Sequence, residues 1–330
     1  MSHTQTVASS HQRRSTVAAS ERAQQIVGRS ALRKLMVRKD WPGLLFLAAH
    51  LGLIGLSGTW IYFALSTWWI VPATFVHGIF IVHLFAPLHE CSHSTAFKSR
   101  WLNQTTYWFC ALTLGLAPLH FKLQHADHHT YTQDVERDPQ MIIMGERLWG
   151  YLYYASAIPY FRDIVSVLVR HALGRFSERE QRYVYPTARK QVQRQAWIML
   201  GAYGLIAAVS VVTQSWAALT FWLIPRIVSE PVERLIRLAE HGGCDHTEDM
   251  LQNTRTILTW APVRWLCWNM PLHTAHHAAP QVPFHAMLEL NRILVSHVKE
   301  LRHGYPATVR HQVSMLMAKE RDLRAREACG

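Results

Sequence analysis

Two long stretches without a charged side chain dominate this sequence of 330 residues. No Asp, Glu, Lys or Arg occurs between Asp40 and Glu90, and none occurs from Gln195 to Pro225. About 20 apolar residues are enough to cross the hydrocarbon core of a bilayer. The first stretch is therefore long enough for two helices, and the second exceeds one ordinary span. We expect an all-α integral membrane protein.

Each uncharged stretch is predicted to form a hairpin of two transmembrane helices, which gives about four spans. The first hairpin would turn near Ser66-Thr67 and the second near Gln214-Ser215, with Arg226 snorkelling where the second hairpin ends. A single tilted helix is the alternative for residues 195–228. Since neither turn contains Lys or Arg, the positive-inside rule places both termini and all charged segments in the cytosol.

Composition suggests how the rest of the chain is organised. Residues 1–38 are predicted to be a disordered cytosolic tail, residues 39–305 a membrane domain with a helical cytosolic cap, and residues 306–330 a charged C-terminal tail. The formal net charge of +12 suits anionic lipid headgroups beside apolar spans, so we expect membrane lipid and not nucleic acid as a partner. If the protein is bacterial, the membrane would be the inner membrane.

Histidines form three clusters on the predicted cytosolic side. The spacing H-x-x-H-H occurs twice and the spacing H-x-x-x-H occurs once. Positions i, i+3 and i+4 share one face of a helix, so each triplet directs its imidazoles toward one small volume. Eight convergent imidazoles exceed the four ligands of a structural zinc site and indicate two metal ions. The eight are His89, His93, His125, His128, His129, His273, His276 and His277.

The order of these clusters, with two predicted hairpins among them, resembles the membrane fatty-acid desaturase and hydroxylase superfamily, which is marked by three histidine boxes. The neighbouring residues are similar too, because Thr130-Tyr-Thr follows His129, Asp138-Pro139 comes soon after, and Asn269-Met-Pro-Leu precedes His273. The resemblance covers about residues 41–300. It extends to compact bacterial members, including enzymes of the dihydrorhizobitoxine desaturase type.

This resemblance implies a non-haem di-iron centre on the cytosolic face that uses O2 to remove hydrogen from an unactivated C–H bond. Two Fe ions would be the cofactor, and the substrate would be an acyl chain of a fatty acid or lipid. The alternative is the same chemistry, desaturation or hydroxylation, on a small amino-acid-derived metabolite such as dihydrorhizobitoxine. Since no dinucleotide-binding or haem domain is evident, we expect a separate ferredoxin or cytochrome donor with its reductase.

The resemblance also implies a ninth ligand upstream of the third cluster. His241 is the matching position, and His246 is the alternative. Acidic residues are candidate acceptors for the outer ring N–H groups, which would fix the orientation of each imidazole. These candidates are Asp127, Asp138, Glu240 and Asp245.

The remaining histidines are expected to have structural roles. His50 and His77 would pack as neutral rings within the first hairpin, and His83 and His120 would support the clusters. Five others are predicted to lie at the surface: His171, His285, His297, His303 and His311.

Two other classes of metal protein remain open. The run from His89 to His93, with Glu90, fits the H-E-x-x-H of an intramembrane zinc protease in which the Glu is the base. That interpretation leaves both H-x-x-H-H triplets unused. A metal transporter would place its ligands mid-membrane, whereas these clusters lie outside the predicted spans. Metal content separates the three classes, because only the oxygenase-type enzyme would hold about two iron ions per chain.

Overall fold

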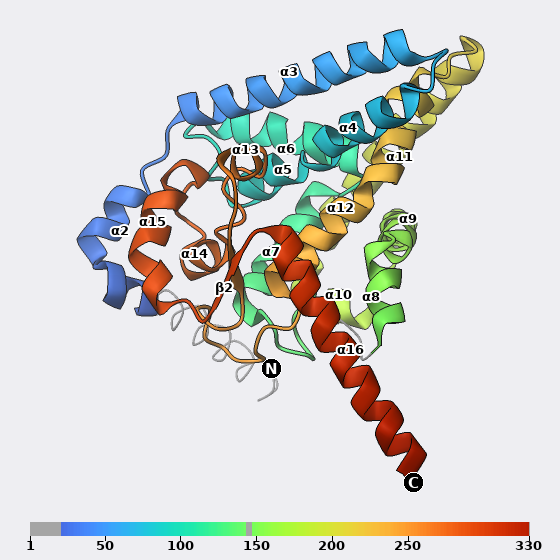
Figure 1. The fold of residues 1–330 in the computed structure, drawn as a ribbon. Helices are drawn as coiled ribbons and strands as arrows, with labels where there is room; N and C mark the ends of the chain where they lie inside the picture. Colours follow the sequence, from blue (N-terminus) through green and yellow to red (C-terminus); the bar gives the residue numbers. More distant parts are fainter. Residues whose placement is uncertain (1–20, 143–146, 330) are drawn as a thin grey trace. The chain divides into compact units, whose positions relative to one another are not determined.

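The structure is a computed structural model that describes residues 21–142 and 147–329. It is mostly helical (Figure 1), which confirms the predicted fold class. The chain divides into two compact units, each built from separate segments. Unit 1 comprises Met1–Arg38, Leu123–Leu148 and Arg237–Gly330, and unit 2 comprises Lys39–Lys122 and Trp149–Ile236.

Unit 2 contains the long apolar helices. Within the described residues, three helices are long and apolar enough to cross a membrane: Asp40–Ala64 (α3), Ile70–Ser92 (α4, Ile70–Val82, continuing into α5, Phe85–Ser92) and Pro186–Val212 (α11). The first hairpin turns between Ala64 and Ile70, where Thr67 Oγ1 donates to the Ala64 carbonyl at 3.0 Å. This turn lies where the sequence predicted it.

The second hairpin differs in part from the prediction. The chain turns as predicted at Gln214, whose φ is 51°, and continues through a π-helical turn, η1 (Leu219–Leu223), into α12 (Ile224–His241). The sequence predicted a fourth span here, but this segment is not among the three apolar helices. The reason is its charge, because α12 buries Arg226, Glu230 and Arg234 within unit 2.

Helices α4 and α12 approach each other closely within unit 2. A Cβ added at Gly78 of α4 would overlap the carbonyl oxygen of Pro225 and the hydroxyl of Ser229. The Ser229 hydroxyl donates to the Phe75 carbonyl at 2.9 Å across the same contact. Glycine is therefore required at position 78, because any side chain would push the two backbones apart.

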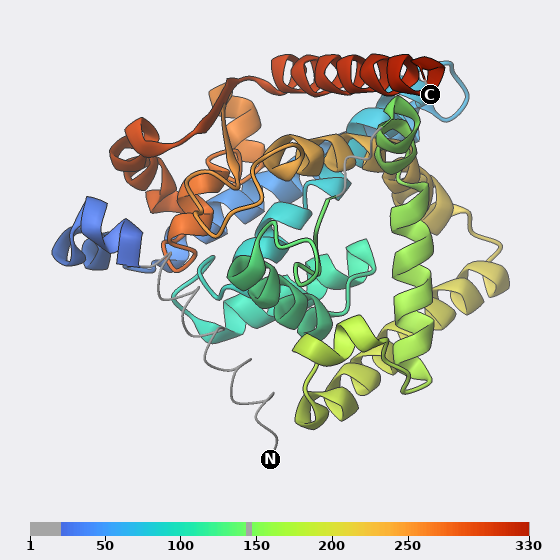
Figure 2. The same ribbon diagram turned by 90° about the horizontal axis from the view of Figure 1, so that it is seen from below.

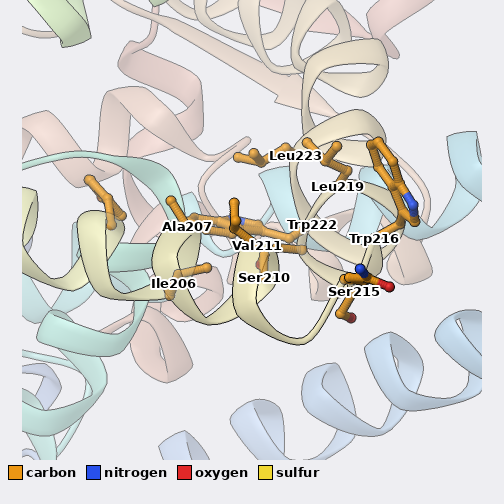
Figure 3. Close-up of a pocket in the computed structure, with 12 residues that line it drawn as sticks. Ile206, Ala207, Ser210, Val211, Ser215, Trp216, Leu219, Trp222 and Leu223 are labelled. Carbon is orange, nitrogen blue, oxygen red and sulfur yellow. The ribbon is translucent and has the colours of Figure 1, made fainter.

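An apolar cavity of about 780 Å³ lies between α11 and η1 (Figure 3). Ile206 and Val211 from α11 face Leu219 and Leu223 from η1, and Trp216 lies near the turn. The π-helical turn widens the helix locally, and such turns often mark functional positions. None of the residues that line this cavity is a predicted metal ligand.

The remaining helices of unit 2 are shorter. They are α6 (Arg100–Leu114), the first turn of α7 (Pro118–Tyr131), α8 (Leu148–Ala155), α9 (Ile158–Ala172) and α10 (Glu178–Tyr183). Helix α9 packs against α11, and α5 packs against α6. A capping box formed by Ser177 and Glu180 starts α10.

In the part of the chain that the structure describes, unit 1 combines short helices and one long helix with a two-stranded parallel sheet that the sequence did not predict. Strand β1 (Arg255–Leu258) pairs with β2 (Glu300–His303) in a register that places Arg255 opposite Glu300. Strands of four residues separated by more than 40 residues give little sequence signal. The helices are α2 (Arg29–Leu35), α13 (Ala261–Leu266), α14 (His273–Ala278), α15 (Met287–Leu294) and α16 (Tyr305–Cys329), with 3-10 turns at Phe284–Ala286 and Val295–His297.

The two predicted tails contain helices. Residues 1–20 lie outside the described residues, and α2 follows them and buries Leu32 and Leu35 in an apolar cluster with Leu290 and Leu294. The C-terminal segment forms α16, which Figure 2 shows as one long helix.

Candidate metal centre

Helix α7 presents the second histidine cluster on one face. His125, His128 and His129 lie at positions i, i+3 and i+4 of this helix, and all three are buried. Pro118 starts the helix, where its fixed φ suits the first turn. The chain leaves the helical path at Gln133, whose φ is 67°. The part of α7 that carries the histidines belongs to unit 1.

The third cluster forms α14 of unit 1. This helix begins at His273 and ends at Ala278, two residues before Pro280. His273, His276 and His277 are each at most 2% exposed. As in α7, the spacing places the three rings on one side of the helix.

His241 is the last residue of α12, where Gly242 and Gly243 end the helix. The terminal carbonyls of α12 are satisfied by buried side chains of unit 1. Arg255 donates to the carbonyls of Ala239 (2.7 Å) and Gly242 (3.0 Å), and Gln312 donates to Gly242 (2.9 Å). These bonds fix the end of the helix and hence the position of His241.

The seven buried histidines of unit 1 bring their ring nitrogens together. Two groups of three can be recognised, and within each group one nitrogen per ring lies within 4.8 Å of the others. Nε2 atoms of neighbouring rings are 2.7 to 3.1 Å apart. The groups are His125 with His129 and His276, and His128 with His241 and His277, while His273 contacts both His241 and His277.

Side chains of unit 1 hold the outer nitrogens of several rings. His128 Nδ1 lies 2.8 Å from Asp138 Oδ1, and His125 Nδ1 lies 2.9 Å from Gln140 Oε1. Because a carboxylate and an amide oxygen only accept, both Nδ1 atoms donate, and the lone pair of each neutral ring is on Nε2. The predicted role of Asp138 as a partner of a ring N–H agrees with this contact.

Burial keeps four of the rings in unit 1 neutral. It lowers the pKa of His125, His241, His273 and His277 well below the ordinary value, and the neighbouring imidazoles lower it further. A neutral imidazole is the form that binds a metal ion. The electrostatics of the centre therefore favour metal binding and disfavour protonation.

His89 and His93 belong to unit 2. His89 lies on α5 and is fully buried, His93 follows the last residue of that helix, and the two ring centroids are 5.0 Å apart. The buried Glu90 accepts a hydrogen bond from Thr95 Oγ1 at 2.8 Å. The role of both histidines as metal ligands remains a prediction from the sequence pattern.

His241 and its alternative, His246, have different surroundings. His246 is exposed, and its Nδ1 lies 3.0 Å from the Gln133 carbonyl instead of near another ring. Of the other acidic candidates, Glu240 is buried 3.9 Å from His273 Nδ1, and Asp245 pairs with Lys299 at the surface. Asp127 is buried on α7.

A further polar cluster lies in unit 2 and was not predicted. His120, His171 and Glu180 are buried, with ligand-type atoms within 4.8 Å of one another. Glu180 accepts from His171 Nε2 (3.0 Å) and from Arg170 (2.6 and 3.1 Å). The prediction that His171 lies at the surface is wrong, because His171 is 0% exposed and its ring stacks on Phe176 with the centroids 4.8 Å apart.

His50 and His77 have structural partners within unit 2, in agreement with the prediction. His50 Nε2 lies 2.7 Å from the Phe80 carbonyl. His77 lies 2.7 Å from the Ser57 hydroxyl and 3.0 Å from the Phe221 carbonyl. Both rings join neighbouring helices, which explains why polar groups occur in this apolar region.

Comparison with known proteins identifies the family. Residues 66–308 match the fatty acid desaturase family, which is more than two thirds of the chain. The chain belongs to this family. It is therefore an oxidoreductase, and the H-x-x-H-H clusters that converge in unit 1 are the histidine clusters of a desaturase.

Known members similar to this desaturase act on lipids, according to their names. A sphingolipid delta(4)-desaturase of Drosophila melanogaster is 24% identical over 76% of this chain and 74% of its own length. An sn-1 oleoyl-lipid 12-desaturase of Synechocystis is 23% identical over 74% of this chain and 72% of its own length. An sn-1 acyl-lipid omega-3 desaturase (ferredoxin) of Nostoc is 20% identical over 74% of this chain.

The buried histidines fit the di-iron centre that is typical of this family. Two Nε2 atoms in contact need either an N–H on one of them or a cation that both can bind. The rings of His241, His273 and His277 make two such contacts in series, and a metal ion would satisfy all three nitrogens. Imidazole is a suitable ligand for iron.

Proposed function

We propose that this family member is an O2-dependent di-iron desaturase of the membrane, which introduces a C=C double bond into an acyl chain of a fatty acid or lipid. The observation that carries this proposal is the convergence of buried Nε2 atoms from α7, α12 and α14 in unit 1. His89 and His93 of unit 2 are proposed to complete a set of nine ligands together with the seven histidines of unit 1.

Two iron ions, when bound, would supply the oxidation of an unactivated C–H bond by O2. In the overall reaction, CH2–CH2 loses two hydrogens, and O2 takes these together with two electrons and two protons to give two waters. The residues of the chain have simpler tasks. Asp138 and Gln140 orient the rings of His128 and His125, and the burial of the histidines keeps bulk water away.

Each turnover needs two electrons from outside the chain. We propose a separate donor of the ferredoxin or cytochrome type, served by its own reductase. The name of the Nostoc relative, which includes ferredoxin, supports this choice. The excess of Lys and Arg outside the apolar stretches supports a cytosolic location for both termini and the metal centre.

The acyl substrate is supported by the lipid-acting relatives and by the long apolar helices of unit 2. One observation favours the alternative, a small amino-acid-derived metabolite. Helix α12 buries a chain of charges within unit 2, in which Glu230 pairs with Arg234 at 2.8 Å and lies 3.9 Å from Arg226. Arg226 also lines a cavity of about 290 Å³ in unit 2, where its guanidinium would pair with the carboxylate of a zwitterionic metabolite but not with an apolar acyl chain.

Alanine substitution of the histidines tests the proposed metal centre. Replacement of His241, or of any histidine in the two H-x-x-H-H triplets, should lower bound iron and abolish desaturation, because each ring supplies a ligand nitrogen. His246→Ala is the matched control, since His246 is exposed and close in sequence. Bound iron and lipid products of purified membranes would be measured for each variant. Full iron content in several triplet variants would contradict the proposed ligand set.

A further inference from the structure

Thr132 of unit 1 is buried immediately after α7 and contacts two of the histidine clusters. It is 3% exposed. Its hydroxyl lies 2.6 Å from the His128 carbonyl and 3.1 Å from His277 Nδ1. Asn253, which is also buried, donates to the Thr132 carbonyl at 3.1 Å and holds the backbone in place. The hydroxyl thus joins the end of α7 to α14.

Counting protons determines the direction of both hydrogen bonds. A hydroxyl has one proton to donate and two lone pairs that accept. The carbonyl of His128 can only accept, so the Thr132 proton is donated there. The hydroxyl must then accept from His277, which requires an N–H on Nδ1. In a neutral ring this leaves the lone pair on Nε2, the atom that faces the other histidines.

If the protein binds iron as proposed above, the contact between Thr132 and His277 bears on how the metal is held. We propose that Thr132 is a positioning residue that holds His277 in the tautomer and orientation needed to bind iron. Without the hydroxyl, the Nδ1–H of His277 loses its acceptor, and the ring can rotate or exchange tautomers. His277 shares its group with His128 and His241, so the iron at this group should be weakened most.

Three variants of the full-length protein test the role of Thr132. Thr132→Val removes the hydroxyl at nearly constant shape, and Thr132→Ser restores it. Thr130→Val is the matched control: Thr130 is also buried on α7, and its hydroxyl makes the same type of bond, 3.0 Å to the Ala126 carbonyl. Metal-depleted protein in detergent would be titrated with Fe2+ under anaerobic conditions against a colorimetric ferrous chelator.

We expect Thr132→Val to bind one of its two iron ions about 10- to 100-fold more weakly, with Thr132→Ser and Thr130→Val close to the wild type. Equal affinities for Thr132→Val and the wild type would overturn the proposal. An equal loss in Thr130→Val and Thr132→Val would also overturn it, because the effect would then come from the helix. If the wild type binds no iron, the proposed function fails, and titration with Zn2+ would still compare the three variants.

Discussion

The buried histidines of the metal centre differ in the group that holds their outer nitrogen. His128 donates to a carboxylate, His125 to an amide and His277 to a hydroxyl. A carboxylate partner makes an imidazole a more basic ligand than a neutral partner does. The two groups of histidines are therefore chemically inequivalent, with the more strongly donating ring in the group of His128, His241 and His277.

Asp138 also organises the loop that follows α7. Its Oδ1 accepts from the backbone N–H of Gln140 at 2.8 Å as well as from His128, and its Oδ2 accepts from the backbone N–H of Gln133 at 3.0 Å. The same loop thus carries Thr132, Asp138 and Gln140, each of which contacts a different histidine. Spacing within α7 indicated the candidate ligands, whereas the hydroxyl and amide partners of their rings become apparent only once the loop is folded.

At the residue scale, His120 should make stability depend on pH. Burial, together with the neighbouring His171 and Arg170, lowers its pKa to about 3, although Glu180 acts in the opposite direction. Its Nε2 also lies 3.1 Å from the Tyr183 hydroxyl. An unfolded His has a pKa near 6.5. Below about pH 6.5 the unfolded state therefore binds more protons, and stability falls as the pH decreases.

His120→Phe removes this titration and keeps a ring. Because the unfolded state takes up a proton at His120, the free energy of unfolding of the wild type should be up to about 2 kcal/mol lower at pH 5 than at pH 7. We expect the melting temperature of the variant to fall less between pH 7 and pH 5 than that of the wild type, whatever the absolute values. An identical fall in melting temperature for the variant and the wild type would show that His120 is not buried as a neutral ring. Glu180 of the folded protein does not titrate between pH 5 and pH 7, because its hydrogen-bond donors lower the pKa of its carboxyl group.

At the scale of elements, α12 combines two environments in one helix. Its first three turns bury paired charges and Ser229 within unit 2, and its last residue, His241, lies among the histidines of unit 1. The sequence places Gly242-Gly243 directly after His241, where the helix ends. It did not indicate that the charged face is buried, because alternating Arg and Glu along a helix are also typical of a solvated face.

The close approach of α4 and α12 gives a prediction for Gly78. Gly78→Ala should destabilise the protein by roughly 1–3 kcal/mol, because the added Cβ overlaps the backbone oxygen of Pro225, which cannot rotate away. Gly204→Ala on α11 is the matched control, since no atom lies within 4 Å of its added Cβ. Thermal denaturation in detergent would compare the two variants. Equal melting temperatures would contradict the close helix contact.

At the scale of the whole molecule, much of the architecture could be predicted from simple sequence signals. Uncharged stretches indicated the apolar helices and both hairpin turns, because the cost of burying charge in lipid constrains a sequence strongly. The histidine triplets could be recognised because their spacing is local. The short parallel sheet and the cluster of His171 with Glu180 could not be predicted, since each depends on pairing between segments that local spacing does not reveal.

We propose that this family member holds two iron ions and uses O2 to remove hydrogen from its substrate. The most direct measurement is metal analysis of protein purified from membranes, combined with mass analysis of acyl lipids and amino-acid metabolites incubated with O2 and a reductant. We expect about two iron ions per chain and a product two mass units lighter that requires O2. Bound zinc in place of iron, or turnover without O2, would contradict it.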